Sequence, residues 1–229
     1  MRRVSSAKLD AYRFLAPYYE WLVHLIFRDE LHKAHQDILC YGQSELLKAK
    51  QIIWIGGGTG YCLHDILERA PQAKLIYIEP SWAMMKRAQA QVDSKLNDRV
   101  EWVLAPYTWL FETPQVHRWS HESIDVILTF FFLDVLPKTD CNLLMNWAQK
   151  QGVTAWFFAD FIPQQKWYKI IFICFMYQCF ALTTKIEQRH LLNHHVLFEQ
   201  TFWEEQLGSA RLRAGGLVKS CLFKPNQGN

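Results

Sequence analysis

The sequence lacks the signatures of several common classes of protein. Its 229 residues contain no internal repeat, no low-complexity tract and no run of Lys or Arg longer than a pair, and the net charge is only +3. A repeat architecture, a disordered chain and a strongly basic nucleic-acid-binding surface are therefore not indicated. We expect no nucleic-acid partner.

Cysteine and histidine are present without the spacing that binds metal. The six cysteines are scattered, form no C-x-x-C pair and in several cases lie within apolar periods, where cysteine behaves as a small hydrophobic residue. The adjacent His194 and His195 do not match the ligand spacing of a tetrahedral site. We therefore expect free thiols in a reducing compartment and no metal site.

No export signal is visible at the amino terminus. Arg2 and Arg3 begin the chain, but Asp10, Arg13 and Glu20 interrupt any apolar stretch before a cleavage site could occur. A cytoplasmic location is the expectation. Half of the residues are apolar and 15% are aromatic, which is enough for a large core, so residues 1–229 are predicted to form a single domain.

The most informative stretch is residues 52–60, Ile-Ile-Trp-Ile-Gly-Gly-Gly-Thr-Gly. The four apolar residues predict a buried strand of a parallel sheet, and the glycines predict a tight turn where the backbone can approach a ligand. A helix is predicted over 61–70, and its first N–H groups would face the same place. The pattern is typical of a nucleotide-binding turn.

The spacing of the glycines and of one acid reduces the number of nucleotide ligands that fit this turn. A dinucleotide fingerprint has glycine at its sixth position, but that position is Tyr61 here. Glycine recurs instead at Gly56, Gly58 and Gly60. A second apolar strand ends in Glu79, about 20 residues downstream, where a carboxylate can accept both hydroxyls of a ribose.

Together the glycine turn, the helix, the second strand and its acid resemble the class I S-adenosylmethionine-dependent methyltransferases. The resemblance covers residues 12–161 and implies S-adenosylmethionine as the cofactor. The residues that it assigns to cofactor binding are Gly56, Gly57, Gly58, Thr59, Gly60, Glu79, Pro80, Ser81, Met84, Pro106, Tyr107, Thr129, Phe130, Tyr12 and Tyr19. For Ser81, capping of the following helix is the stronger interpretation.

The remainder of the core alternates strand and helix, which predicts an α/β fold with a Rossmann-like, doubly wound sheet. A terminal antiparallel hairpin, joined by Gly215 and Gly216, would complete seven mostly parallel strands, after a last helix at 195–206. The predicted strands are 52–55, 75–78, 100–104, 124–129, 154–159, 210–214 and 217–223, and the predicted core helices are 61–70, 82–93 and 139–150.

Within this domain, residues 1–49 are expected to form an N-terminal helical lid, 50–161 the cofactor-binding core, and 162–225 the substrate-cover helices and the hairpin. Helical spacing over 6–39 predicts one or two helices, with a break at Pro17. The aromatic stretch from Tyr12 to Glu20 is similar to the segment that precedes the core of many small-molecule methyltransferases, including quinone methyltransferases. This similarity implies that Tyr12 and Tyr19 cover the cofactor, with Tyr18 as the alternative; simple packing against the sheet explains the tyrosines equally well.

Two positions depart from the family's pattern. Trp54 stands where an acid commonly helps to hold the amino end of the methionine portion, and Asp134 is the candidate to compensate. Ala105, Pro106 and Tyr107 stand where an acid often holds the adenine amino group, so stacking and the Tyr107 backbone N–H are the expected substitutes.

No compact catalytic signature is present, which fits a cofactor whose sulfonium already makes the methyl group electrophilic. The candidates for a proton-accepting group are Asp134, Asp160, His190 and His194. Each also has a structural explanation: Asp134 could cap a helical turn, Asp160 could hold a turn before Pro163, and the histidines could begin a polar helix.

Residues 167–182 are apolar nearly all round. They are too short and too interrupted to span a bilayer, and they are compatible with a buried helix, a membrane-surface helix or the roof of an apolar pocket. A lipophilic substrate or a peripheral membrane is thus the partner predicted for this segment.

The sequence therefore predicts methyl transfer from S-adenosylmethionine to a small, apolar or aromatic acceptor. The first alternative is a non-catalytic protein of the same fold that binds S-adenosylmethionine or S-adenosylhomocysteine, an interpretation favoured by Trp54 and Pro106. An NAD-binding oxidoreductase is disfavoured by Tyr61.

Overall fold

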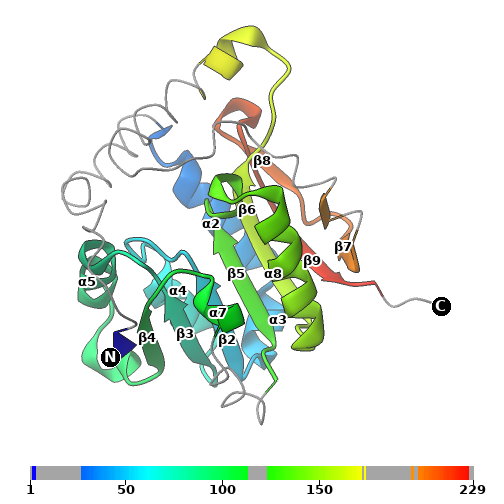
Figure 1. The fold of residues 1–229 in the computed structure, drawn as a ribbon. Helices are drawn as coiled ribbons and strands as arrows, with labels where there is room; N and C mark the ends of the chain where they lie inside the picture. Colours follow the sequence, from blue (N-terminus) through cyan, green and yellow to red (C-terminus); the bar gives the residue numbers. More distant parts are fainter. Residues whose placement is uncertain are drawn as a thin grey trace.

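One sheet runs through the centre of the protein, as Figure 1 shows for the computed structural model. The strand order is β1-β4-β3-β2-β5-β6-β9-β7, with β8 pairing beside β7 on the outer edge of β9. The residues that the structure describes are 2–3, 27–112, 123–171, 173, 197–198 and 201–226. The strands are β1 (Arg2–Arg3), β2 (Gln51–Ile55), β3 (Lys74–Ile78), β4 (Val100–Leu104), β5 (Val126–Phe130), β6 (Ala155–Phe161), β7 (Trp203–Glu205), β8 (Arg211–Arg213) and β9 (Val218–Pro225).

Strands β1 to β6 are parallel, and β9 returns antiparallel to β6. The chain builds outward from β2 through β3 to β4, and then crosses back to place β5 on the other side of β2. The order of the strands thus reverses between β2 and β5, and ligands of such sheets bind outside the carboxyl ends of the strands at this switch point.

Helices cover both faces of the sheet because alternate strand residues point to opposite sides. Ile53 and Ile55 pack in one buried cluster with α7 and α8, whereas Ile52 and Trp54 pack in a second cluster with α2, α3, α4 and α5. The helices are α2 (Glu30–Tyr41), α3 (Gln43–Lys48), α4 (Leu63–Arg69), α5 (Trp82–Ala90), α6 (Ser94–Asn97), α7 (Trp109–Glu112) and α8 (Lys138–Lys150), with 3₁₀ turns η2 (Leu133–Val135) and η3 (Ala214–Gly216).

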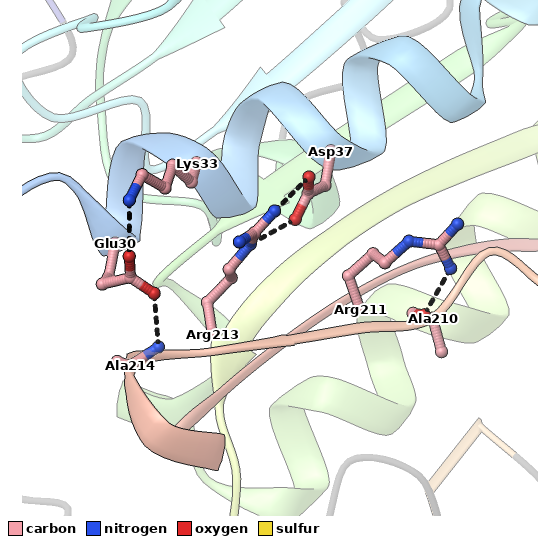
Figure 2. Close-up of polar contacts among 7 residues, drawn as sticks. All are labelled: Glu30, Lys33, Asp37, Ala210, Arg211, Arg213 and Ala214. Carbon is pink, nitrogen blue, oxygen red and sulfur yellow. Dashed lines mark hydrogen bonds and ion pairs between the residues drawn. The ribbon is translucent and has the colours of Figure 1, made fainter.

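Polar contacts fasten α2 to the C-terminal hairpin (Figure 2). The Arg213 guanidinium donates two hydrogen bonds to the Asp37 carboxylate, at 2.7 and 2.8 Å, and Glu30 accepts the backbone N–H of Ala214 at 3.1 Å. A bidentate pair fixes geometry as well as distance. The described part of the N-terminal region is therefore held over the hairpin.

The predicted fold class is confirmed, and so are the five core strands, the hairpin and the three core helices, with ends shifted by one to three residues. One predicted helix is wrong in part: residues 203–205 form β7, because they pair with β9 at the edge of the sheet. Helix α4 begins at Leu63 instead of Tyr61, since the turn continues through Cys62. Strands β1 and β7 extend the sheet beyond the predicted seven strands. Most of the helical stretch predicted over 6–39 precedes residue 27 and lies outside the described residues.

Candidate functional site

The turn between β2 and α4 places the glycines at the switch point. Gly56, Gly58 and Gly60 have φ of +67°, +60° and +71°, in the region where an L side chain is strained. The Gly56 N–H donates to the Ile78 carbonyl at 2.9 Å, which fixes the turn to the end of β3. These residues form a turn because glycine adopts this backbone without steric cost.

Close packing explains why most positions of this turn need glycine, but it does not explain Gly58. A Cβ would lie 2.3 Å from the Phe132 ring at Gly56, 2.2 Å from the Tyr77 ring at Gly57 and 2.6 Å from the Ala88 Cβ at Gly60. At Gly58 the same atom would meet nothing within 4 Å among the described residues. Room for a ligand against the backbone is therefore found beside Gly58.

Two side chains of β3 and its end hold Gly58 in place. The Glu79 carboxylate is buried, and its Oε2 accepts the Gly58 N–H at 2.9 Å while its Oε1 accepts the Ser81 N–H at 2.8 Å. The Tyr77 hydroxyl donates to the Gly58 carbonyl at 2.9 Å. Ser81 Oγ in turn accepts the N–H of Met84 at 3.2 Å, so Ser81 caps α5. The predicted acid is thus at the glycine turn.

The remaining described residues of the predicted cofactor site lie at the ends of β3, β4 and β5. Pro80 and Pro106 are exposed in the turns after β3 and β4. Thr129 is fully buried, and its Oγ1 accepts the indole N–H of Trp156 at 2.8 Å. Phe130 points to the opposite face of the sheet, where its ring packs edge-on against Trp54. The Thr129 side chain therefore belongs to the core between the sheet and α8.

Tyr107 joins the end of β4 to the start of α8. Its hydroxyl hydrogen-bonds the Asp140 carboxylate, and its ring meets Phe132 edge-on with centroids 5.8 Å apart. Burial, and then the hydrogen bond and the negative charge of Asp140, raise the pKa of Tyr107 above its ordinary value. The hydroxyl therefore stays protonated near neutral pH.

Two predicted catalytic candidates meet at the ends of β5 and β6. Asp160 is fully buried, its Oδ2 accepts the Asp134 N–H at 3.0 Å and its Oδ1 accepts the Phe161 N–H at 2.9 Å. Burial raises the pKa of Asp160 well above its ordinary value, and the adjacent charge and side-chain hydrogen bond of Asp134 raise it further. The two acids therefore lie close together in a buried setting that favours the neutral form of Asp160.

The backbone before this acid pair is strained. Phe131 has a φ of +53°, which costs a non-glycine residue about 1–2 kcal/mol. Its N–H donates to the Ala159 carbonyl at 2.7 Å, and its ring packs with His35 and Phe161.

Asp134 lies inside η2 rather than at its N-cap. The Cys141 thiol lies near the two acids, and its pKa is raised to about 12 by burial and by the neighbouring Asp160.

Four candidates, Tyr12, Tyr19, His190 and His194, lie outside the described residues, as do Phe172 and 174–182. Within the described ranges, no cluster of three potential metal ligands occurs, and no helix has the length and apolar character to cross a membrane.

Sequence reasoning missed several residues of the site. Tyr77 was detectable, since it precedes Glu79 by two positions and strand residues two apart share a face. Gln91, whose Nε2 donates to the Thr59 carbonyl at 3.0 Å, and His32, whose ring stacks on Tyr61 with centroids 3.4 Å apart, gave no sequence signal. Their contacts join separate helices to the turn.

Known proteins share this domain and this fold. Residues 53–150 match the family model of a methyltransferase domain. No curated protein sequence matches the chain significantly. The domain match and the shared fold below confirm the resemblance to class I methyltransferases.

Three solved structures illustrate the likeness. An O-methyltransferase family 2 protein from Planctomyces limnophilus, in complex with apigenin, is 17% identical with a TM-score of 0.65, over 96% of this chain and 62% of that one. An O-methyltransferase family protein from Burkholderia thailandensis is 12% identical with a TM-score of 0.63, over 93% and 60% of the two chains. The magnesium protoporphyrin IX methyltransferase from Synechocystis, with bound S-adenosylmethionine, is 9% identical with a TM-score of 0.59, over 97% and 100%.

The match covers 54% of mitomycin 7-O-methyltransferase, so this chain spans a little over half the length of that protein. At these identities the likeness establishes the Rossmann-like fold that such methyltransferases share.

Proposed function

We propose, from the premise that residues 53–150 form a methyltransferase domain with the class I fold, that the protein transfers a methyl group from S-adenosylmethionine to a small acceptor. One observation carries the proposal: Glu79 and Tyr77 hold Gly58, the glycine with open space beside it, at the switch point of the sheet. This is where a doubly wound sheet binds a nucleotide.

The residues present fit the cofactor. The open side of Gly58 leaves room for close approach of a ligand to the backbone, and the Glu79 oxygens can each accept a further hydrogen bond from a ribose hydroxyl. When bound, S-adenosylmethionine supplies a methyl group that its sulfonium has already made electrophilic. The protein then has to hold the acceptor in line and exclude water.

The acceptor is proposed to be apolar or aromatic. Three consecutive phenylalanines lie at the carboxyl end of β5: Phe130 is its last residue, and Phe131 and Phe132 follow it. Among the similar structures, one holds apigenin and another 2-hydroxy-5-methyl naphthoic acid, which are both aromatic hydroxyl compounds. Aromatic side chains suit such ligands because they offer large apolar area with favourable edge and face geometry.

A proton acceptor is needed only for an acceptor that must lose a proton. Asp134 and Asp160 remain the described candidates, because they lie together at the ends of β5 and β6 and the raised pKa of Asp160 makes its carboxylate a stronger base. In that role, the pair would take up the proton that an acceptor hydroxyl loses. His190 and His194 are retained as proposals.

One observation supports a contact of residues 167–171 with a membrane or a lipophilic acceptor. Residues 167–171 begin a helix, and four of them are large apolar side chains that face solvent: Trp167 is 72% exposed, Tyr168 50%, Ile170 43% and Ile171 60%. Such aromatic residues are typical of membrane interfaces. Cosedimentation with liposomes, compared with the variant Ile171→Glu, tests this contact; equal cosedimentation of the two would remove it.

Calorimetric titration with S-adenosylmethionine, S-adenosylhomocysteine and NAD, run in parallel, tests the cofactor. We expect micromolar binding of the first two and none of NAD. Binding without turnover, in an acceptor screen that starts with phenols and quinones, would favour the non-catalytic alternative; binding of NAD alone would favour the oxidoreductase.

A further inference from the structure

Trp54 occupies an unusual position in the site. It is the penultimate residue of β2, two positions before Gly56, and it pairs in register with Tyr77 of β3 and Leu128 of β5. Its side chain therefore lies on the central strand at the switch point. Only 2% of the residue is exposed.

The indole N–H of Trp54 is a buried donor that meets no acceptor among the described residues. Other indoles of the protein are satisfied: Trp156 donates to Thr129 Oγ1 at 2.8 Å, Trp102 to Asn97 Oδ1 at 3.0 Å and Trp203 to the Met145 carbonyl at 3.4 Å. Nearly all buried polar groups are hydrogen-bonded, and an exception calls for an explanation. A bound ligand is one, because it could supply the acceptor.

The ring contacts of the indole connect it to the glycine turn. Its ring meets Tyr77 edge-on with centroids 5.3 Å apart and Phe130 with centroids 5.7 Å apart. Tyr77 in turn holds the Gly58 carbonyl, so the indole is one side chain away from the glycine turn. A donor in an apolar setting forms its strongest hydrogen bonds with a charged oxygen.

We propose that the Trp54 indole N–H donates a hydrogen bond to the carboxylate of the methionyl portion of the cofactor. The inference rests on the proposed function, and it assigns to Trp54 a direct binding role. A carboxylate is the charged oxygen group that S-adenosylmethionine and S-adenosylhomocysteine both carry. Trp54 would thus select ligands with an intact amino-acid end over truncated nucleosides.

The test compares two ligands that differ only in this carboxylate. Binding of S-adenosylhomocysteine and of its decarboxylated analogue is measured by calorimetry for the wild-type protein and for Trp54→Phe, which keeps an aromatic ring and removes the N–H. We expect Trp54→Phe to weaken S-adenosylhomocysteine about 10- to 100-fold, the range of a hydrogen bond to a charged group, and to change the analogue by no more than about twofold.

Trp102→Phe is the matched control. It makes the same substitution two strands away, at a half-buried indole whose N–H is bonded to Asn97. We expect it to leave the ratio of the two affinities unchanged. If Trp54→Phe weakens both ligands equally, or neither, the inference is overturned while the proposed function stands. If the wild-type protein binds neither ligand, the proposed function itself fails and the inference with it.

A second readout needs no variant that might fold poorly. In the wild-type protein labelled with ¹⁵N at the tryptophan indoles, the Trp54 N–H resonance should move downfield with S-adenosylhomocysteine and not with the decarboxylated analogue. Equal movement with both ligands would contradict the proposed hydrogen bond.

Discussion

The two sides of the switch point use buried acids in different ways. On the β3 side, both oxygens of Glu79 accept backbone N–H groups, one of them from the glycine turn itself. On the β6 side, Asp160 also accepts two backbone N–H groups, but it lies against a second acid, Asp134. Both arrangements need neighbouring strands, since Glu79 joins the end of β3 to the turn after β2 and Asp160 joins the end of β6 to the turn after β5, but only the second places two acids together.

The two sites differ in whether a substitution is expected to affect mainly ligand binding or mainly stability. A substitution at the glycine turn can remove binding with little loss of packing, because the space beside Gly58 is open. A substitution in the acid pair must disturb the core, because Asp134 and Asp160 are buried.

The largest effect is expected at Gly58. Gly58→Val should abolish calorimetric binding of S-adenosylhomocysteine, because the side chain fills the open space, at a cost of about 1–2 kcal/mol in stability for the positive φ. Gly152→Val is the matched control: Gly152 has a φ of +72° and open space at its Cβ, but lies in the turn after α8. Loss of binding in the control would show that strain alone is responsible.

Removal of the Asp160 carboxyl should lower stability next most strongly. Asp160→Ala leaves the N–H groups of Asp134 and Phe161 buried without their acceptor, and we expect the free energy of unfolding in urea to fall by about 2–4 kcal/mol. Asp160→Asn keeps an acceptor oxygen and should lose less. An unfolding free energy within about 0.5 kcal/mol of wild type for Asp160→Ala would contradict this account.

At Glu79 the effect should fall on binding as well as on stability, because the carboxylate also accepts the Gly58 and Ser81 N–H groups. Glu79→Ala removes the proposed ribose acceptor and should weaken S-adenosylhomocysteine by about 1–3 kcal/mol, with Glu79→Gln intermediate, as measured by calorimetry. Glu101→Ala, at an exposed acid on the neighbouring β4, is the control. Unchanged binding in Glu79→Ala would remove this residue from the site.

Stability should also depend on pH through Asp160. The folded-state pKa of Asp160 is raised, so the folded protein binds a proton that the unfolded chain releases above its ordinary pKa of about 4. The free energy of unfolding should therefore fall as pH rises above about 4, by at most about 1.4 kcal/mol per pH unit, until Asp160 ionises. Asp134 carries the other charge that acts on Asp160, whereas the nearby Cys141 thiol, whose pKa is raised to about 12, stays neutral over this range.

Denaturation in urea between pH 5 and 9 measures this dependence against Asp160→Asn, whose amide cannot titrate. The variant should show a flatter profile over the pH range in which the wild-type protein loses stability. Parallel profiles would mean that another group controls the pH dependence.

The smallest effect is expected away from both acids, where α2 meets β8. Arg213 and Asp37 form a bidentate pair with side chains 34% and 19% exposed, so solvent screens it. A double-mutant cycle of Arg213→Ala and Asp37→Ala, followed by urea denaturation, should give a coupling of about 1 kcal/mol or less. A coupling above about 2 kcal/mol would place this contact among the main determinants of stability.

The alternation of strands and helices, the glycine turn and the acid that follows the next strand could all be predicted from the sequence. These are local patterns, since apolar runs, glycine spacing and an acid at a strand end act within about 30 residues of chain. The same information predicted that Ser81 caps α5, and the cap is present. The sequence misplaced the start of α4, assigned residues 203–205 to a helix and missed the edge strands β1 and β7, because turn geometry and strand pairing override local preference.

Which side chains face one another depends on the folded sheet. The pairing of Asp134 with Asp160, the hydroxyl of Tyr77 on the Gly58 carbonyl, and the buried indole of Trp54 all depend on strand order and register. A linear sequence does not reveal such contacts, because residues far apart in the chain meet only when the sheet brings β2, β3, β5 and β6 together. The chemistry was therefore present in the sequence, whereas its geometry came from the fold.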